Sequence, residues 1–281
     1  MFEIIGLLTA FIGIFVLRAK NIDFYIAITA AALIIGLTSG APVRILFDVL
    51  IQTLSAYNTW NLVSAVALIT VLGYALKETG LMVNFIEGLS NILPGNILMA
   101  TIPALFGFLS MPGGALMSAP FIEPEADKLG LKPEHKSYYN VWFRHLLYWV
   151  NPITSSTIMA VSLSGIPVTT WLRVQSPLFF VMAAIGFIAS RGFIETPKKN
   201  EGPKGLTMDA MKGGLPIVVT VALTLYGIPI WASLAAGTLT AMLLGRVKPD
   251  KTVEIVSKGI RWDLVLAIIS MLYLRDRIGA S

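Results

Sequence analysis

The sequence contains no cysteine and only two histidines. The missing thiols exclude disulfides, thiolate metal sites and cysteine nucleophiles, and so few histidines argue against a zinc site. Charged residues are also scarce, at 13% against about 25% in a typical soluble domain. Hydrophobic residues reach 56%, and the mean hydropathy is +0.76. This composition predicts an integral membrane protein whose surroundings are the lipid bilayer.

Sequence motifs of common enzyme classes are absent as well. We find no phosphate-binding loop, no dinucleotide-binding fingerprint and no metalloprotease helix motif. No pattern of nucleophile and base is present either, so we expect neither an enzyme nor a resident cofactor. The net charge of +5 comes mostly from lysine and arginine in loops, which indicates membrane topology rather than nucleic-acid binding. Residues 4–17 lack the basic flank and the cleavage site of a signal peptide.

The sequence contains several long apolar runs. A membrane-spanning helix needs about 17–25 mostly apolar residues, and on this basis we expect an all-α polytopic fold with about eight spans. The expected spans cover residues 4–17, 22–37, 61–76, 138–163, 171–189, 208–226 and 228–244, with a last one from 264. We further expect a surface helix at 41–57, an amphipathic segment at 81–93 and a charged loop at 123–136.

Two stretches of the chain resemble each other. The run Trp60-Asn61-Leu62-Val63 opens one apolar segment, and Trp262-Asp263-Leu264-Val265 opens another. The loop before the first copy has a single basic residue, Arg44. The loop before the second copy has five, namely Arg246, Lys248, Lys251, Lys258 and Arg261. Because basic loops stay in the cytoplasm, we expect the copies to lie inverted in the membrane, as in many secondary transporters.

The repeat divides the chain into four parts. Residues 1–165 are expected to form the first transporter repeat, 171–190 a connecting span, 191–207 a polar cytoplasmic linker and 208–281 a second, inverted repeat. An N-terminus outside the cell membrane puts all but four of the 21 lysines and arginines inside. The four outside are Arg44, Arg173, Arg275 and Arg277. This count requires residues 96–122 to enter and leave on one side, as a re-entrant helical hairpin.

The middle of residues 96–122 carries the run Ser110-Met111-Pro112-Gly113-Gly114. Proline cannot continue a helix interior, two glycines let the backbone turn, and the apolar arms of about 12 residues are too short to span. Backbone groups freed at such a break are tolerated only inside protein or beside a wet cavity. The positive N-terminal end of the next helix suits an anion there. The alternative is a proline kink in an ordinary span.

A second break is expected at Asn151-Pro152-Ile153-Thr154-Ser155-Ser156-Thr157, which interrupts the apolar residues 138–163. Amide and hydroxyl side chains at membrane depth need partners. They can bind substrate oxygens or, together with freed backbone carbonyls, Na⁺ as a coupling ion. The alternative is that they hold helices together, because serine and threonine commonly hydrogen-bond across helices.

Arg144 and His145 lie in the same apolar stretch. A charge at bilayer depth normally faces a partner or water. Arg144 can pair with a substrate carboxylate, and histidine is the side chain suited to proton coupling. Neighbours on a helix point about 100° apart, so the two are not expected to face one cavity. The alternative is that Arg144 extends to the inner interface and His145 is packed.

Two motifs carry a resemblance to a known family. The run from Ser110 to Pro120 and the run Asn140-Val141-Trp142-Phe143-Arg144-His145 resemble the prokaryotic membrane family called domain of unknown function 401. That family is placed in the ion transporter superfamily, with gluconate permeases and citrate and dicarboxylate carriers. The resemblance covers most of the chain. It implies two inverted repeats, each with a re-entrant hairpin and a broken helix, and an anionic organic substrate driven by H⁺ or Na⁺.

The sequence departs from this pattern in its second half. Pro112 follows Trp60 by 52 residues and Pro152 follows it by 92. The same spacings from Trp262 would place a second hairpin and a second break beyond residue 281, so the second repeat is expected to be incomplete. A C-terminally truncated chain explains this, and a homodimer that supplies the missing half is the alternative.

Taken together, the residues predict a secondary active transporter of a small carboxylate-type anion. The expected substrate or ion site consists of Ser110, Pro112, Gly113, Gly114, Asn151, Pro152, Thr154, Ser155, Ser156 and Thr157, with Arg144 or His145 for charge coupling. One alternative is a channel, which cannot accumulate solute against a gradient. The other is a non-transporting remnant or a membrane assembly subunit.

Overall fold

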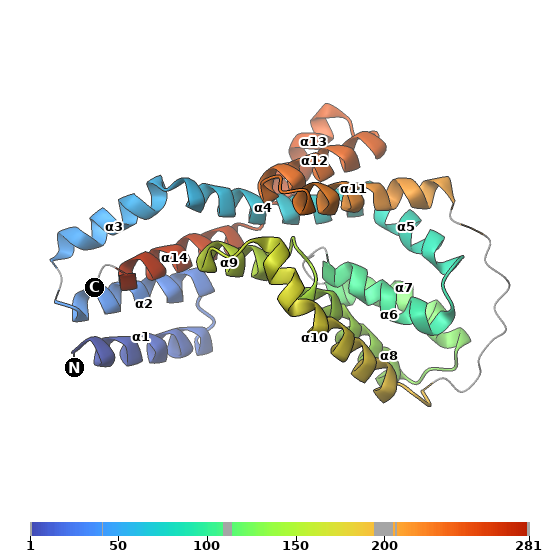
Figure 1. Ribbon diagram of the computed structural model, residues 1–281, viewed down its shortest axis with the longest axis horizontal. Helices are drawn as coiled ribbons and strands as arrows, with labels where there is room; N and C mark the ends of the chain where they lie inside the picture. The colour runs from blue at the N-terminus through green and yellow to red at the C-terminus, as the bar shows by residue number, and fades with distance from the viewer. Residues whose placement is uncertain (1, 41, 109–113, 194–204, 206, 280–281) are drawn as a thin grey trace. The chain divides into compact units, whose positions relative to one another are not determined.

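The computed structural model describes residues 2–40, 42–108, 114–193, 205 and 207–279 (Figure 1). Every regular element within these residues is a helix, which confirms the all-α class. The chain divides into two compact units. One consists of Met1–Ala67 with Arg261–Ser281, and the other of Leu68–Ile260. The two ends of the sequence share a unit because the last helix packs against the second one.

The first unit is built from helices of both ends of the chain. It contains α1 (Phe2–Ala19), α2 (Phe24–Thr38), α3 (Val43–Ser55), the beginning of α4 (Tyr57–Glu78) and α14 (Trp262–Gly279).

Helices α2 and α14 of this unit run parallel. Thr29 Oγ1 donates to Ser270 Oγ at 2.9 Å, and Arg277 Nη2 donates to the carbonyl of Gly36 at 3.3 Å. The same offset of 241 residues therefore holds at both contacts. The contacts are two helical turns apart, so one face of each helix stays turned to the other.

The second unit holds the middle of the chain. It contains the rest of α4, then α5 (Leu81–Ser90), α6 (Gly95–Phe108), α7 (Gly114–Lys128), α8 (Pro133–Trp142), the 3₁₀ helix η1 (Phe143–Trp149), α9 (Ser155–Ser164), α10 (Val168–Ala189), α11 (Met208–Leu225), α12 (Ile230–Leu244) and α13 (Pro249–Gly259). Helix α11 packs tightly on α5, where a Cβ on Gly213 would lie 2.3 Å from the carbonyl oxygen of Leu81.

Three of the described helices are long and apolar enough to cross a membrane by length and composition: Tyr57–Glu78, Val168–Ala189 and Met208–Leu225. Shorter apolar helices accompany them, including Phe24–Thr38 and Ile230–Leu244. Helix α10 leaves large apolar side chains such as Val174 and Phe180 exposed. In water such a surface would drive association, so the apolar helices indicate a membrane protein.

One sequence prediction about the middle of the chain is wrong, and a second is confirmed only in part. Residues 123–136 are not one charged loop, because α7 continues to Lys128 and α8 begins at Pro133. The acidic residues sit on the last turns of α7, where Lys128 Nζ lies 3.1 Å from Glu125 Oε2. The segment 138–163 is interrupted at Asn151-Pro152 as predicted, but the part before the break is not one α-helix. It is divided between α8 and η1, because the backbone tightens into a 3₁₀ helix before the Asn-Pro break.

The order of helices recurs along the chain. Helices α1 to α4 have 18, 15, 13 and 22 residues, and α11 to α14 have 18, 15, 11 and 18. In each set the first two helices pack against each other, the third is short, and the fourth carries the Trp-Asn/Asp-Leu-Val run. The opposite orientation of the two sets in a membrane stays a prediction.

Candidate functional site

The first predicted break lies between α6 and α7. Helix α6 ends at Phe108 and α7 begins at Gly114. Ser110, Pro112 and Gly113 lie outside the described residues. The two helices pack on each other, with the rings of Phe106 and Phe121 centred 5.6 Å apart. Two packed helices, α6 and α7, thus cover the ends of the predicted hairpin 96–122; its turn and its re-entrance into a membrane stay predictions.

The second predicted break, between η1 and α9, joins the first one through Asn151. This side chain is fully buried. Its Oδ1 accepts the N–H of Ile153 at 3.0 Å, which is an Asx-type turn. Its Nδ2 donates to the carbonyl of Phe108 at 2.7 Å, the last residue of α6. The side-chain amide of Asn151 therefore joins the turn before α9 to the C-terminal end of α6. Pro152 beside it is buried as well.

The hydroxyl groups after Asn151 bond mainly to one another. Thr154 caps α9, because its Oγ1 accepts the N–H of Thr157 at 3.2 Å. The same hydroxyl donates to Thr157 Oγ1 at 3.0 Å and lies 3.1 Å from Ser156 Oγ. Thr154 and Thr157 are buried, Ser156 is exposed and Ser155 begins α9. These contacts cap the start of α9 and join no second helix; binding of an ion or a substrate by the cluster stays a prediction.

Arg144 and His145 lie side by side in η1 with different surroundings. Arg144 is half-buried, and α6 approaches its backbone so closely that a Cβ on Gly107 would lie 1.8 Å from the Arg144 carbonyl oxygen. His145 is exposed, with Nδ1 2.8 Å from the carbonyl oxygen of Val141 and its ring edge-on to Tyr148. The different burial agrees with the expectation that the two do not face one cavity.

Sequence reasoning missed a further contact beside the first break. Ser118 of α7 is fully buried, and its Oγ donates to Asn140 Oδ1 of α8 at 2.6 Å. Asn140 also lines a cavity of about 140 Å³ together with Ala119, Ile122, Glu123, Lys136 and Ser137. Both residues lie in the two runs that resemble the family, and this shared membership was the available signal. Other polar residues of the two runs, Ser110, Arg144 and His145, were predicted as site residues instead.

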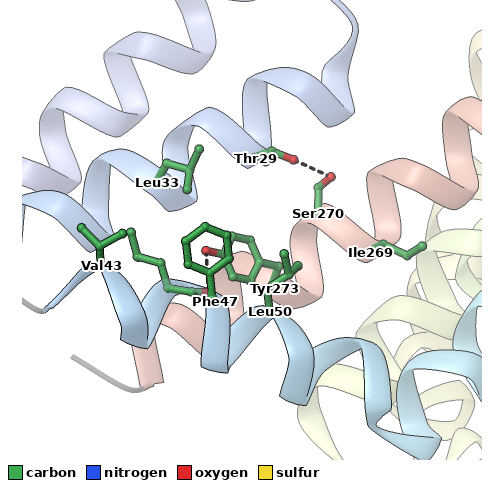
Figure 2. Close-up of a pocket in the computed structure, with 9 residues that line it drawn as sticks. Thr29, Leu33, Val43, Phe47, Leu50, Ile269, Ser270 and Tyr273 are labelled. Atoms are coloured by element: carbon green, nitrogen blue, oxygen red, sulfur yellow. Dashed lines mark hydrogen bonds between the residues drawn. The ribbon is translucent and has the colours of Figure 1, made fainter.

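A second missed feature is an apolar pocket of about 330 Å³ in the first unit (Figure 2). It lies among α2, α3 and α14 and is lined by Thr29, Leu33, Val43, Leu46, Phe47, Leu50, Ile269, Ser270 and Tyr273. Its few hydroxyls are engaged. Thr29 and Ser270 face each other across their hydrogen bond, and Tyr273 donates to the carbonyl of Leu46 at 3.2 Å. Three helices that are distant in the sequence form this pocket, so no local sequence pattern could have predicted it.

Arg277, whose predicted position on the outer side stays a prediction, is a fully buried residue of α14. Its Nη2 donates to Ser39 Oγ at 2.7 Å and to the carbonyl of Gly36 at 3.3 Å, at the C-terminal end of α2. A cation is favoured there because a helix C-terminus carries partial negative charge. The Nε and Nη1 atoms have no hydrogen-bond acceptor among the described residues.

These features define a membrane protein in which every regular element among the described residues is a helix, and in which the turn before α9 contacts the end of α6. Within the described residues, no group of three or more His, Asp or Glu side chains could hold a metal ion. The chain belongs to the family described as Protein of unknown function (DUF401), whose model matches residues 3–273. This match confirms the resemblance drawn from the two motifs, whereas the ion transporter superfamily and the truncation stay predictions. The chain matches no curated protein and no solved structure.

Proposed function

We propose that this protein is a secondary active transporter of a small organic anion of the carboxylate type, driven by H⁺ or Na⁺. The observation that carries the proposal is the hydrogen bond from Asn151 Nδ2 to the carbonyl of Phe108. It joins two places where apolar helices stop inside the chain. In membrane transporters, broken helices of this kind supply the freed backbone groups and helix ends that bind substrate and coupling ion.

The chemistry of the joint suits an anion and a cation together. Helix α9 begins four residues after Asn151, and helix N-termini attract negative charge. The hydroxyls of Thr154, Ser156 and Thr157 are oxygen ligands that, with backbone carbonyls, suit Na⁺. We assign Ser110, Pro112 and Gly113 to this site from the sequence alone.

Charge coupling is assigned to the neighbouring 3₁₀ helix. Arg144 would balance the charge of a carboxylate substrate. His145 would carry a proton if H⁺ is the driving ion, since its exposed ring leaves Nε2 accessible beside the Nδ1 contact with Val141.

The recurring helix order supports a transporter that works by alternating access. Transporters of this class are built from two repeats that move against each other in a cell membrane, and the helix order of α1 to α4 recurs in α11 to α14. The expected topology places the N-terminus outside and the basic loops in the cytoplasm. Because the chain has no cysteine, single cysteines at Arg44 in α3 and Lys251 in α13 test it directly. A membrane-impermeant maleimide should label Arg44→Cys and spare Lys251→Cys in intact cells.

Transport itself is tested in proteoliposomes containing the full chain. We expect uptake of a labelled mono-, di- or tricarboxylate above its external concentration when a pH or Na⁺ gradient is imposed. Ser110→Ala combined with Thr154→Ala should abolish this uptake, and Thr154→Ser, which keeps a capping hydroxyl, should retain it. Ser164→Ala, at the exposed end of α9, is the matched control. Equilibration without accumulation would indicate a channel, and no uptake of any carboxylate would favour an assembly subunit.

A further inference from the structure

The pocket of the first unit and the guanidinium of Arg277 are neighbours. Tyr273 lines the pocket and precedes Arg277 by one turn of α14. Leu46 also lines it, and a Cβ on Gly36 would lie 2.1 Å from Leu46 Cδ2 and 2.9 Å from Arg277 Nε. Leu46 Cδ2 and Arg277 Nε both lie beside Gly36. The guanidinium therefore lies close to two residues that line the pocket, Leu46 and Tyr273.

Among the residues that the structure describes, no carboxylate is paired with Arg277, which bonds to the Gly36 carbonyl and the Ser39 hydroxyl. Asp276 accepts Thr53 Oγ1 at 2.7 Å and Arg275 Nη2 at 2.6 Å. Asp48 lies 3.8 Å from Arg44 Nε on the exposed side of α3. Among the described residues, Arg277 bonds to a carbonyl and a hydroxyl, both through Nη2. A buried cation calls for a counter-charge and for acceptors of its remaining N–H groups.

The shape of the pocket fits a hydrocarbon chain. It lies along α2 and α14 between the Thr29–Ser270 contact and the Gly36–Arg277 contact, a length of about 10 Å at 1.5 Å per helical residue. Two of its lining residues, Leu33 and Phe47, are 41% and 62% exposed. In a membrane protein, exposed apolar side chains of this kind face lipid. The pocket therefore opens toward the acyl chains of the bilayer.

We propose that this pocket binds one acyl chain of an anionic membrane lipid, whose head group is held by Nε and Nη1 of Arg277 beside Ser39. Arg277 stands at the end of α2, where the chain turns into α3, so the head group would lie at the membrane surface and the chain would run inward. Because Arg277 is fully buried and Leu46 lies beside it at Gly36, contact with the guanidinium requires the Leu46 side chain to change rotamer. Basic pockets between membrane helices bind anionic head groups in this way.

A water-soluble polar anion fits the same pocket poorly. The hydroxyls of Thr29 and Ser270 bond to each other, and the Tyr273 hydroxyl is used by the Leu46 carbonyl. The body of a polar ligand would find apolar walls and lose its hydration. An acyl chain has no such requirement, and it is present at high concentration in the surrounding bilayer.

The experiment is native mass spectrometry of the full chain, reconstituted in an equal mixture of phosphatidylcholine and phosphatidylglycerol and released into detergent. We expect one phospholipid to stay bound, with phosphatidylglycerol preferred by about fivefold, the effect of one basic side chain at an anionic surface. Arg277→Gln should remove the preference, whereas Arg277→Lys should keep most of it. The matched control is Arg275→Gln, which removes a paired charge from the same helix end.

Filling the pocket tests the acyl chain separately and without removing a charge. Leu33→Trp should abolish retention of both lipids, and Leu37→Trp, at an exposed position of α2 outside the pocket lining, should leave it unchanged. The proposal is overturned if wild type retains no lipid, if Arg275→Gln acts like Arg277→Gln, or if Leu33→Trp keeps the lipid. Retention of added decanoate in place of phospholipid would overturn it too, because the site would then take a free carboxylate.

Discussion

Two contacts between helix ends, which we call the Asn151 joint and the Arg277 joint, are built from similar groups but differ in how completely their hydrogen bonds are satisfied. In the second unit, Asn151 donates to the carbonyl at the end of α6, and the adjacent Gly107 lets η1 approach. In the first unit, Arg277 donates to a carbonyl near the end of α2, that of Gly36, whose missing side chain leaves room for α14. Each joint thus combines a glycine, a helix-end carbonyl and a buried polar donor.

The difference lies in how completely each donor is used. The amide of Asn151 is neutral, and both its ends are bonded. Arg277 carries a charge and keeps Nε and Nη1 without acceptors among the described residues, beside a pocket. A buried polar group that is satisfied stabilises the fold, whereas one that is unsatisfied costs free energy unless a ligand completes it. The Asn151 joint of the second unit therefore stabilises the fold by itself. The Arg277 joint of the first unit has unused N–H donors that a ligand can bind.

The largest effect is expected from Gly107→Ala. The new Cβ would meet the Arg144 carbonyl oxygen at 1.8 Å, and backbone cannot move aside as a side chain can. We expect a loss of about 3 kcal/mol in the free energy of unfolding, measured by tryptophan fluorescence during denaturation in detergent. Gly13→Ala is the control, because its Cβ would meet only Ile34 Cδ1 at 3.5 Å. Equal stability of the two variants would contradict the close approach of α6 and η1.

Asn151→Ala should have the next largest effect. It leaves the Phe108 carbonyl and the Ile153 N–H without the partner they now share, which costs about 2 kcal/mol. Asn151→Asp separates the two bonds, because its carboxylate still accepts the Ile153 N–H but cannot donate to Phe108 while ionised. Hydrogen exchange at the end of α6 and at Ile153 reports each bond. Faster exchange at Ile153 in the Asp variant than in the Ala variant would refute this division of roles.

Gly36→Ala should cost less than Gly107→Ala, although both positions are crowded. The atoms in its way, Leu46 Cδ2 and Arg277 Nε, belong to side chains that can shift, so we expect about 1–2 kcal/mol. The same denaturation experiment in detergent measures this loss of unfolding free energy. If Gly36→Ala lowers the free energy of unfolding more than Gly107→Ala, then the Arg277 joint is the more rigid of the two and the comparison is reversed.

The smallest effect is expected at the cap of α9. Thr154→Ala removes the oxygen that accepts the Thr157 N–H, and loss of an N-cap costs about 1 kcal/mol. Thr154→Ser keeps that oxygen and should restore the wild-type unfolding midpoint. If both variants are equally unstable, packing of the Thr154 methyl group, rather than capping, stabilises this segment.

Much of the helix pattern was predictable from the residues. The break at Asn151-Pro152 follows from local chemistry, since asparagine favours a turn and proline lacks a backbone donor. Proline alone does not mark a break, because Pro103, Pro177 and Pro216 lie inside helices. The extension of α7 to Lys128 was missed because Glu123, Glu125 and Asp127 resembled a loop, while Lys128 and Lys136 pair with these carboxylates and permit helix there. The 3₁₀ helix at residues 143–149 could not be predicted from the apolar pattern, since hydrophobicity does not distinguish a 3₁₀ helix from an α-helix.

The sequence by itself determined that this chain belongs in a membrane, where its helices break and which segments repeat. These properties depend on composition and on neighbours within a few residues. Only the tertiary structure decided that Asn151 meets Phe108, 43 residues away, and that Arg277 meets Gly36, 241 residues away. It also decided that one of these donors is satisfied while the other faces a pocket. Contacts over such distances depend on how whole helices pack, and no local rule of residue type specifies that packing.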